Sequence, residues 1–148
     1  LLRLSTDLHV GVLGTLTTVK GACVVNSLAT YIQKEELDIS VSVIGQTLTP
    51  VVPGVKVFGP YEKNMLPDIL SKEGINVVLM ASIVPETFSY TISEAMDLGL
   101  PIVAFDLGAQ GRRVRKYKLG EVVPLNSSPE LILSMMQSVL KRAIRRRK

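Results

Sequence analysis

The stretch NVVLMASIVPETFSYTISEAMDLGLPIVAF, residues 76–105, contains the pattern that decides the fold. It begins with an apolar run at 76–80, continues through a polar loop and a segment of helical spacing at 91–98, and ends in a second apolar run at 101–105. Continuous short apolar runs are typical of strands that are covered on both faces, as in parallel sheets. Gly99 and Pro101, which follow the helical segment, mark its end. The stretch therefore predicts one strand–helix–strand unit.

The same alternation of strand and helix patterns runs along the rest of the chain. The expected strands cover residues 9–14, 39–45, 55–58, 76–80, 101–105 and 121–123. The expected helices cover residues 22–33, 62–72, 91–98 and 110–117, and a last one runs from a cap at Ser127 or Ser128 to about residue 144. Because no hairpin-turn signal separates the strands, consecutive strands should be parallel. We therefore expect a single α/β domain with a Rossmann-like, doubly wound parallel sheet.

The composition suits one folded domain that lies in a reducing compartment. The chain has 148 residues, of which 47% are hydrophobic and 20% charged. No apolar run approaches the roughly 20 residues of a membrane span, and the first residues have no signal-peptide pattern. The single cysteine, Cys23, falls in an apolar helical pattern, so we expect a buried thiol. With one cysteine and one histidine, a zinc site is not expected, and the location is expected to be cytoplasmic.

The charges are distributed unevenly along the chain. Residues 1–111 hold 6 basic and 11 acidic side chains, a net charge of −5, whereas residues 112–148 hold 11 basic and 2 acidic ones, a net charge of +9. The eight residues from Lys141 to Lys148 include six of these cations. Nucleic acid is not expected as a partner, because residues 112–148 contain a single aromatic residue and no base-reading motif. The inner face of an anionic membrane, bound peripherally, a missing domain, and a solvated helix end all remain open as explanations.

Two of the expected strand ends carry polar residues, and ligands of doubly wound sheets bind at such ends. The first is the segment GTLTTVKG at residues 14–21. Lys20 can meet a diphosphate as a point charge, and Gly14 lets the backbone approach a ligand. The segment has neither the Walker order of residues nor the dinucleotide fingerprint. On its own it is therefore weak evidence for a phosphate site.

The second strand end carries Glu86 and Glu94, which seven residues separate. The helix expected to start near Thr91 offers unpaired backbone amides, which form an anion site. Two carboxylates beside such a site are repelled by an anion unless they face neutral donors, such as the hydroxyls of a hexose and a ribose. The spacing therefore suggests a nucleotide sugar. Two simpler explanations stay open: residues 91–94 (TISE) form a capping-box sequence, and Glu86 could be a solvated loop residue.

Together these motifs resemble the carboxyl-terminal, donor-binding domain of GT-B retaining glycosyltransferases, in particular the glycosyl transferases group 1 family of the bacterial polysaccharide and O-antigen type. The resemblance extends over residues 10–140, and its most specific part is the pair of glutamates followed by Glu-Ala-Met-x-x-Gly-Leu-Pro. It implies a hexosyltransferase that moves a hexose from a nucleoside diphosphate to an acceptor hydroxyl with retention. No cofactor or metal is expected, since the chain contains no Asp-x-Asp pair.

The resemblance also assigns roles to single residues. It implies that Lys20 and Glu86 are catalytic, with Lys20 on the donor diphosphate and Glu86 accepting hydrogen bonds from the donor sugar. It implies that Glu94 binds the ribose. The other donor-binding residues that it implies are Gly14, Thr15, Gly45, Tyr61, Phe88, Ser89, Tyr90 and Thr91. Thr15 stands where the family often has an arginine, so Lys20 and the helix terminus must carry more of the charge stabilisation.

Finally, the resemblance implies that residues 1–148 are one half of an enzyme, because a GT-B protein needs an amino-terminal acceptor domain that this chain lacks. The isolated chain is expected to bind the donor weakly and not to turn over. Two related readings remain open, a non-catalytic nucleotide-sugar-binding module and half of a GT-B sugar-nucleotide epimerase. A flavodoxin-like signalling module is a third, although residues 10–14 lack the acidic cluster that it needs.

Overall fold

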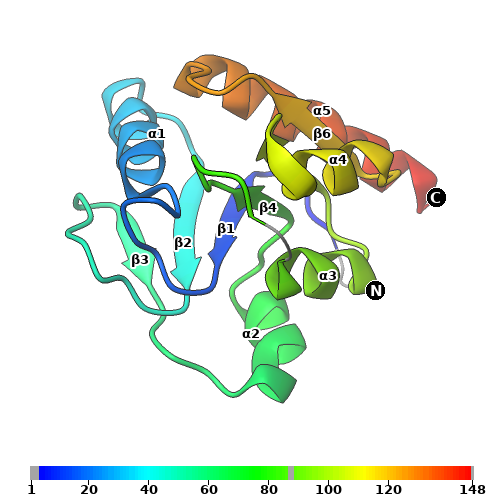
Figure 1. Cartoon of the computed structure of the whole chain (residues 1–148), viewed down its shortest axis with the longest axis horizontal. Coiled ribbons are helices and arrows are strands. Elements are labelled where there is room, and N and C mark those ends of the chain that lie inside the picture. The colour runs from blue at the N-terminus through cyan, green and yellow to red at the C-terminus, as the bar shows by residue number, and fades with distance from the viewer. Residues whose placement is uncertain (1–3, 87–88, 148) are drawn as a thin grey trace.

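Six parallel strands form one sheet in the computed structural model, which describes residues 4–86 and 89–147 (Figure 1). Their spatial order is β3-β2-β1-β4-β5-β6. The strands are β1 (His9–Leu13), β2 (Ser40–Ile44), β3 (Val55–Val57), β4 (Val77–Met80), β5 (Ile102–Phe105) and β6 (Gly120–Val123). The helices are α1 (Ala22–Lys34), the single 3-10 turn η1 (Lys63–Met65), α2 (Leu66–Lys72), α3 (Tyr90–Asp97), α4 (Gly108–Lys116) and α5 (Pro129–Arg146). The predicted single domain with a Rossmann-like, doubly wound parallel sheet is confirmed.

Alternate residues along each strand contact opposite helical layers, as the period of a strand requires. On β5, Val103 and Phe105 belong to a core shared with α1 and α5. Ile102 and Ala104 belong to a second core, shared with α2, α3 and α4. All four side chains are buried. The continuous apolar runs of the sequence therefore arise because helices cover both faces of the sheet.

Cys23 is exposed, so the expected buried thiol is wrong. The buried face of α1 follows the spacing of Ala22, Val25, Leu28, Ala29 and Ile32. Cys23 is displaced from that face by the rotation between successive residues of a helix. The apolar pattern of this segment was therefore broader than the stripe that contacts the sheet.

α5 begins at the second of the two expected caps. The hydroxyl of Ser128 accepts a hydrogen bond from the N–H of Leu131 at 3.2 Å, and Pro129 occupies the first helical position. One face of the helix is buried against the sheet, and its exposed face becomes basic toward the end. Among the described residues no helix has both the length and the apolar character that a membrane span requires.

The centre of the sheet is the point at which the direction of winding changes. β1 and β4 are neighbours and pair through Val10 with Val77 and Gly11 with Val78. From β1 the strands continue to β2 and β3, whereas from β4 they continue to β5 and β6. The loop after β1 leads to α1 on one face, and the loop after β4 leads to α3 on the other. Such a switch point leaves a crevice at the carboxyl ends of the strands.

Candidate functional site

A cavity of about 230 Å³ opens at the carboxyl ends of β1 and β4. Its lining comes from the loop after β1, the loop after β4 and the first turn of α3. The predicted site residues that line it are Gly14, Thr15, Lys20, Glu86, Ser89, Tyr90 and Thr91. Phe88 lies outside the described residues. The fold thus brings together residues from the two strand ends that the sequence had singled out.

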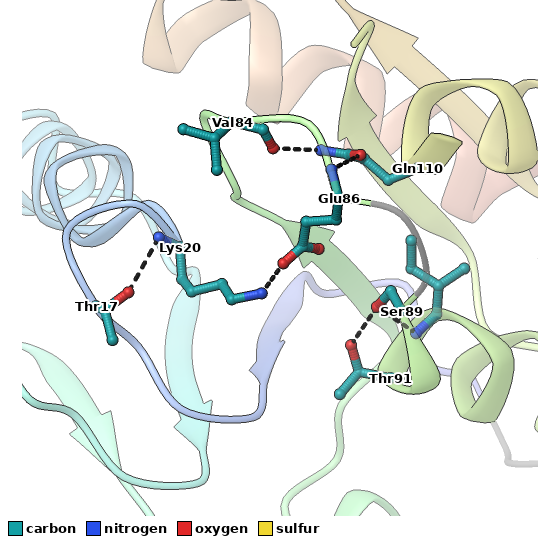
Figure 2. Close-up of polar contacts among 8 residues, drawn as sticks. Thr17, Lys20, Val84, Glu86, Ser89, Thr91 and Gln110 are labelled. Carbon is teal, nitrogen blue, oxygen red and sulfur yellow. Dashed lines mark hydrogen bonds and ion pairs between the residues drawn. The ribbon is translucent and has the colours of Figure 1, made fainter. Parts of the chain in front are cut away.

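Lys20 and Glu86 point toward each other across this cavity and form an ion pair (Figure 2). The Lys20 side chain is 47% exposed, whereas that of Glu86 is 10% exposed. Oε1 of Glu86 contacts the ammonium group, and Oε2 is buried with no hydrogen-bond partner among the described residues. Since an ionised carboxylate only accepts hydrogen bonds, Oε2 is an acceptor that a hydroxyl entering the cavity can satisfy.

Gly21 allows the loop that carries Lys20 to touch the loop after β4. Its φ is +99°, and a Cβ atom at this position would lie 2.1 Å from the carbonyl oxygen of Ala81. The preceding turn is closed by Thr17, whose hydroxyl accepts a hydrogen bond from the N–H of Lys20 at 3.3 Å. Because Gly21 has no side chain, the two loops can lie in close contact, and this contact sets the distance between Lys20 and Glu86.

Gln110 of α4 fixes the loop that carries Glu86, and the sequence analysis missed this role. Its Nε2 donates to the carbonyl of Val84 at 2.8 Å, and its Oε1 accepts from the N–H of Glu86 at 2.8 Å. The residue is 2% exposed and holds the backbone on both sides of Pro85 (Figure 2). The available signal was its spacing of four residues from the buried Val114, which places both on one helical face.

α3 begins two residues earlier, relative to Glu94, than a capping box requires. Ser89 is the cap: its Oγ accepts from the N–H of Ile92 at 3.4 Å, and it lies 3.0 Å from the Oγ1 of Thr91. Thr91 therefore belongs to the first turn, and Glu94 lies beyond the position that pairs with a cap. The capping-box explanation of Glu94 is wrong. The cap places the amides of the first turn next to Lys20 and Glu86 (Figure 2).

Arg113 of α4 holds this helix start in place, and it too was missed. Its Nη1 donates to the carbonyl of Ser89 at 3.1 Å, and its Nη2 donates to the hydroxyl of Ser93 at 2.7 Å. α4 therefore supports both sides of the cavity, through Gln110 on the loop and Arg113 on the helix. The sequence analysis predicted a helix over residues 110–117 and assigned it no role in the site.

Glu94 lines a second cavity of about 400 Å³ that adjoins the first. Gly45 and Tyr61 line it as well, and Gly14, Thr15 and Tyr90 line both cavities. The loop after β1 and the loop after β2 touch here, because a Cβ atom on Gly45 would lie 2.1 Å from the carbonyl oxygen of Gly14. Burial raises the pKa of Tyr61, and the nearby charge of Glu94 raises it further. Glu86 and Glu94 thus serve neighbouring compartments of one crevice.

The family described as glycosyl transferases group 1 matches residues 7–142 of the chain. No curated protein sequence matches the chain significantly. Among solved structures, the chain is similar to the C-terminal domain of a glycosyl transferase group 1 family protein (LpcC) from Francisella tularensis. The identity is 18%, the similarity covers 92% of this chain and 82% of that chain, and the TM-score is 0.65.

Two longer proteins contain a similar domain. One is Alr3699/HepE from Anabaena in complex with UDP-glucose, with 19% identity, coverage of 93% of this chain and 43% of that chain, and a TM-score of 0.66. The other is a glycosyltransferase from Rickettsia africae, with 16% identity, coverage of 94% and 42%, and a TM-score of 0.67. This chain spans less than half the length of either protein. The structural likenesses show the fold, and the match over residues 7–142 shows the family: this chain belongs to the glycosyl transferases group 1 family.

Proposed function

We propose that this chain is the donor-binding half of a GT-B glycosyltransferase, which transfers a hexose from a nucleoside diphosphate to an acceptor hydroxyl with retention. The proposed setting is the cytoplasm, in the synthesis of a cell-surface polysaccharide. One observation carries the proposal: Lys20, Glu86 and the start of α3 line a single cavity, and Glu94 lines the compartment beside it. The UDP-glucose complex of the similar Anabaena protein supports this class of ligand.

The charges of the crevice suggest how a nucleotide sugar lies in it. A diphosphate fits between the Lys20 ammonium and the first-turn amides of α3, which together supply positive charge. The hexose then lies against Glu86, whose buried Oε2 can accept a hydroxyl hydrogen. The ribose extends into the adjoining compartment toward Glu94, and Gly45 and Tyr61 border the base.

The chemistry of this half is stabilisation of the leaving group. Breaking the bond between the sugar and the diphosphate leaves negative charge on the diphosphate, next to Lys20 and α3. Donors that are already oriented toward this charge lower the barrier without reorganisation. Glu86 partly neutralises Lys20 through their ion pair. Donor binding must therefore draw the ammonium toward the phosphates, which leaves Glu86 available for the sugar. This arrangement calls for no metal ion, because Lys20 and the helix terminus meet the diphosphate charge.

Calorimetric titration of the chain with UDP, GDP and dTDP sugars tests the donor site. At least one of them should bind, and Lys20→Ala and Glu94→Ala should each weaken binding about 10- to 100-fold, the value of a charge-assisted hydrogen bond. Lys72→Ala and Asp97→Ala are the matched controls, since both residues are exposed and end their helices at the opposite edge of the sheet. The proposal fails if no nucleotide sugar binds, or if the site variants bind as tightly as the controls.

A non-catalytic nucleotide-sugar-binding module is the second candidate. It is favoured by the fact that Lys20 is the one cation among the described residues that line the first cavity. Both candidates predict donor binding, and both predict no turnover by the isolated chain because the acceptor site is missing. They differ once an acceptor domain is present: a longer protein that contains this domain should transfer sugar in the first case and only bind it in the second. Efficient transfer by the chain alone would contradict both.

A further inference from the structure

A second concentration of charge lies at the amino-terminal edge of the sheet, opposite the donor crevice. α3, α4 and α5 each follow a parallel strand and run back along the sheet, so their last turns meet at this edge. The Nη2 of Arg147 donates to the carbonyl of Gly99 at 2.8 Å, which ties the end of α5 to the turn after α3. Figure 1 shows these two ends on the same side of the molecule.

An open pocket of about 470 Å³ lies between these helix ends. Its rim carries the cations Lys116, Lys118 and Arg146, and its floor includes the apolar side chains of Met96 and Leu119. No carboxylate is among the described residues that line it. We call these five residues the amino-edge pocket. Uncompensated cations above an apolar floor fit a ligand that is anionic at one end and apolar beside it.

The three rim cations are not used to hold the fold together. They are exposed, and no ion pair of theirs occurs within the described residues. Two neighbouring arginines behave differently: Arg115 pairs with Asp106 at 2.5 Å, and Arg142 pairs with Glu121 at 2.6 Å. Among the described residues, Lys116, Lys118 and Arg146 therefore face the amino-edge pocket without the carboxylate partner that Arg115 and Arg142 have.

We propose that the amino-edge pocket docks the protein onto an anionic phospholipid membrane. The headgroup phosphates contact Lys116, Lys118 and Arg146, and the glycerol region lies over Met96 and Leu119. Each lysine or arginine near such a surface strengthens the attraction, which acts within about one Debye length. An acceptor domain of the proposed enzyme is a poorer occupant, since it has to meet the donor crevice at the opposite edge. Docking at the amino edge leaves that crevice open.

Co-sedimentation with vesicles tests this surface. The chain should pellet with phosphatidylcholine vesicles that contain phosphatidylglycerol, it should not pellet with pure phosphatidylcholine, and added salt should release it. The triple variant Lys116→Gln, Lys118→Gln and Arg146→Gln should lower the partition coefficient on the order of 100-fold, as expected for three cations near an anionic surface. Its melting temperature should stay close to that of the parent chain, because the three side chains are exposed.

The control removes the same charge from three positions that do not line the amino-edge pocket. Lys34, Lys63 and Lys72 are exposed and lie on α1, η1 and α2. Their triple replacement by glutamine should leave vesicle binding within a few-fold of the parent. The proposal is overturned if neutral and anionic vesicles retain equal amounts, or if both triple variants lose binding equally. It is also overturned if the chain binds a single-stranded oligonucleotide through the rim cations but binds no vesicle. None of these results depends on donor binding.

Discussion

Lys20 and Glu86 form an ion pair that joins the loop after β1 to the loop after β4. The two ends of the pair differ in their surroundings, because the lysine side chain is 47% exposed and the glutamate side chain 10%. Water can replace the glutamate as a partner of Lys20, but it reaches Glu86 far less easily. Loss of the ion pair therefore leaves the carboxylate less well solvated than the ammonium group.

This asymmetry predicts that Lys20→Ala destabilises the ligand-free domain more than Glu86→Gln does. The first change leaves a nearly buried carboxylate without its cation and should lower the free energy of unfolding by about 1–2 kcal/mol. The second removes the charge and keeps an acceptor for the lysine, so its cost should be below about 1 kcal/mol. Urea denaturation measures both values. The double variant should recover part of the loss of Lys20→Ala, and a larger effect for Glu86→Gln would contradict the buried-carboxylate explanation.

Gln110→Leu should destabilise the domain and weaken donor binding together. It removes both hydrogen bonds to the backbone around Pro85, which should cost about 1–2 kcal/mol, and it frees the loop that orients Glu86. Gln137→Leu is the control, since Gln137 is exposed on α5 and its replacement should change the stability by less than about 0.5 kcal/mol. Denaturation and calorimetric titration on the same variants give both quantities. If Gln110→Leu bound the nucleotide sugar as tightly as the parent, the positioning role would be refuted.

Alanine variants of Gly21 and Gly59 can distinguish the cost of backbone strain from the cost of atomic overlap. Gly21 and Gly59 both have φ of +99°, but a Cβ atom would collide with Ala81 at Gly21 and would meet nothing within 4 Å at Gly59. Gly59→Ala should therefore cost only the strain of a left-handed residue, about 1–2 kcal/mol. Gly21→Ala should cost clearly more, because the two loops must also separate. Similar melting temperatures for the two variants would show that the loops are not in tight contact.

Tyr61 should ionise above its ordinary pKa of about 10, because burial and the charge of Glu94 both favour the neutral phenol. The folded state then keeps a proton that the unfolded chain has lost, so the stability due to Tyr61 is complete below about pH 10 and falls as the pH rises through the folded pKa. Glu94→Gln should lower the pKa only part of the way, since burial remains. Absorbance titration, with Tyr61→Phe as the reference, isolates this residue. An unchanged pKa in Glu94→Gln would mean that the two side chains are farther apart than the second cavity implies.

The fold was predictable because it follows from local residue patterns and from the topology of parallel strands. Apolar runs gave the strands, 3-and-4 spacing gave the helices, and parallel strands place all their carboxyl ends at one edge, which is why Lys20 and Glu86 could be expected to meet. The supports of the site were not predictable in this way. Gln110 and Arg113 act on backbone atoms of distant loops, and such contacts leave no pattern in the neighbouring sequence. The prediction that Cys23 is buried was wrong for a related reason, because the spacing of apolar residues does not fix the width of the buried face of a helix.

The neighbouring central strands β1 and β4 divide the sheet into two wings, β3-β2-β1 and β4-β5-β6, and the crevice opens where the wings meet. A ligand that binds Lys20 and Glu86 at the same time connects the two wings. In the proposed donor complex the ligand would contact both wings, so that moving the wings apart would require release of the ligand. We therefore expect donor affinity and the rigidity of the domain to change together. A variant that weakens the contact between the loop after β1 and the loop after β4 should lower both.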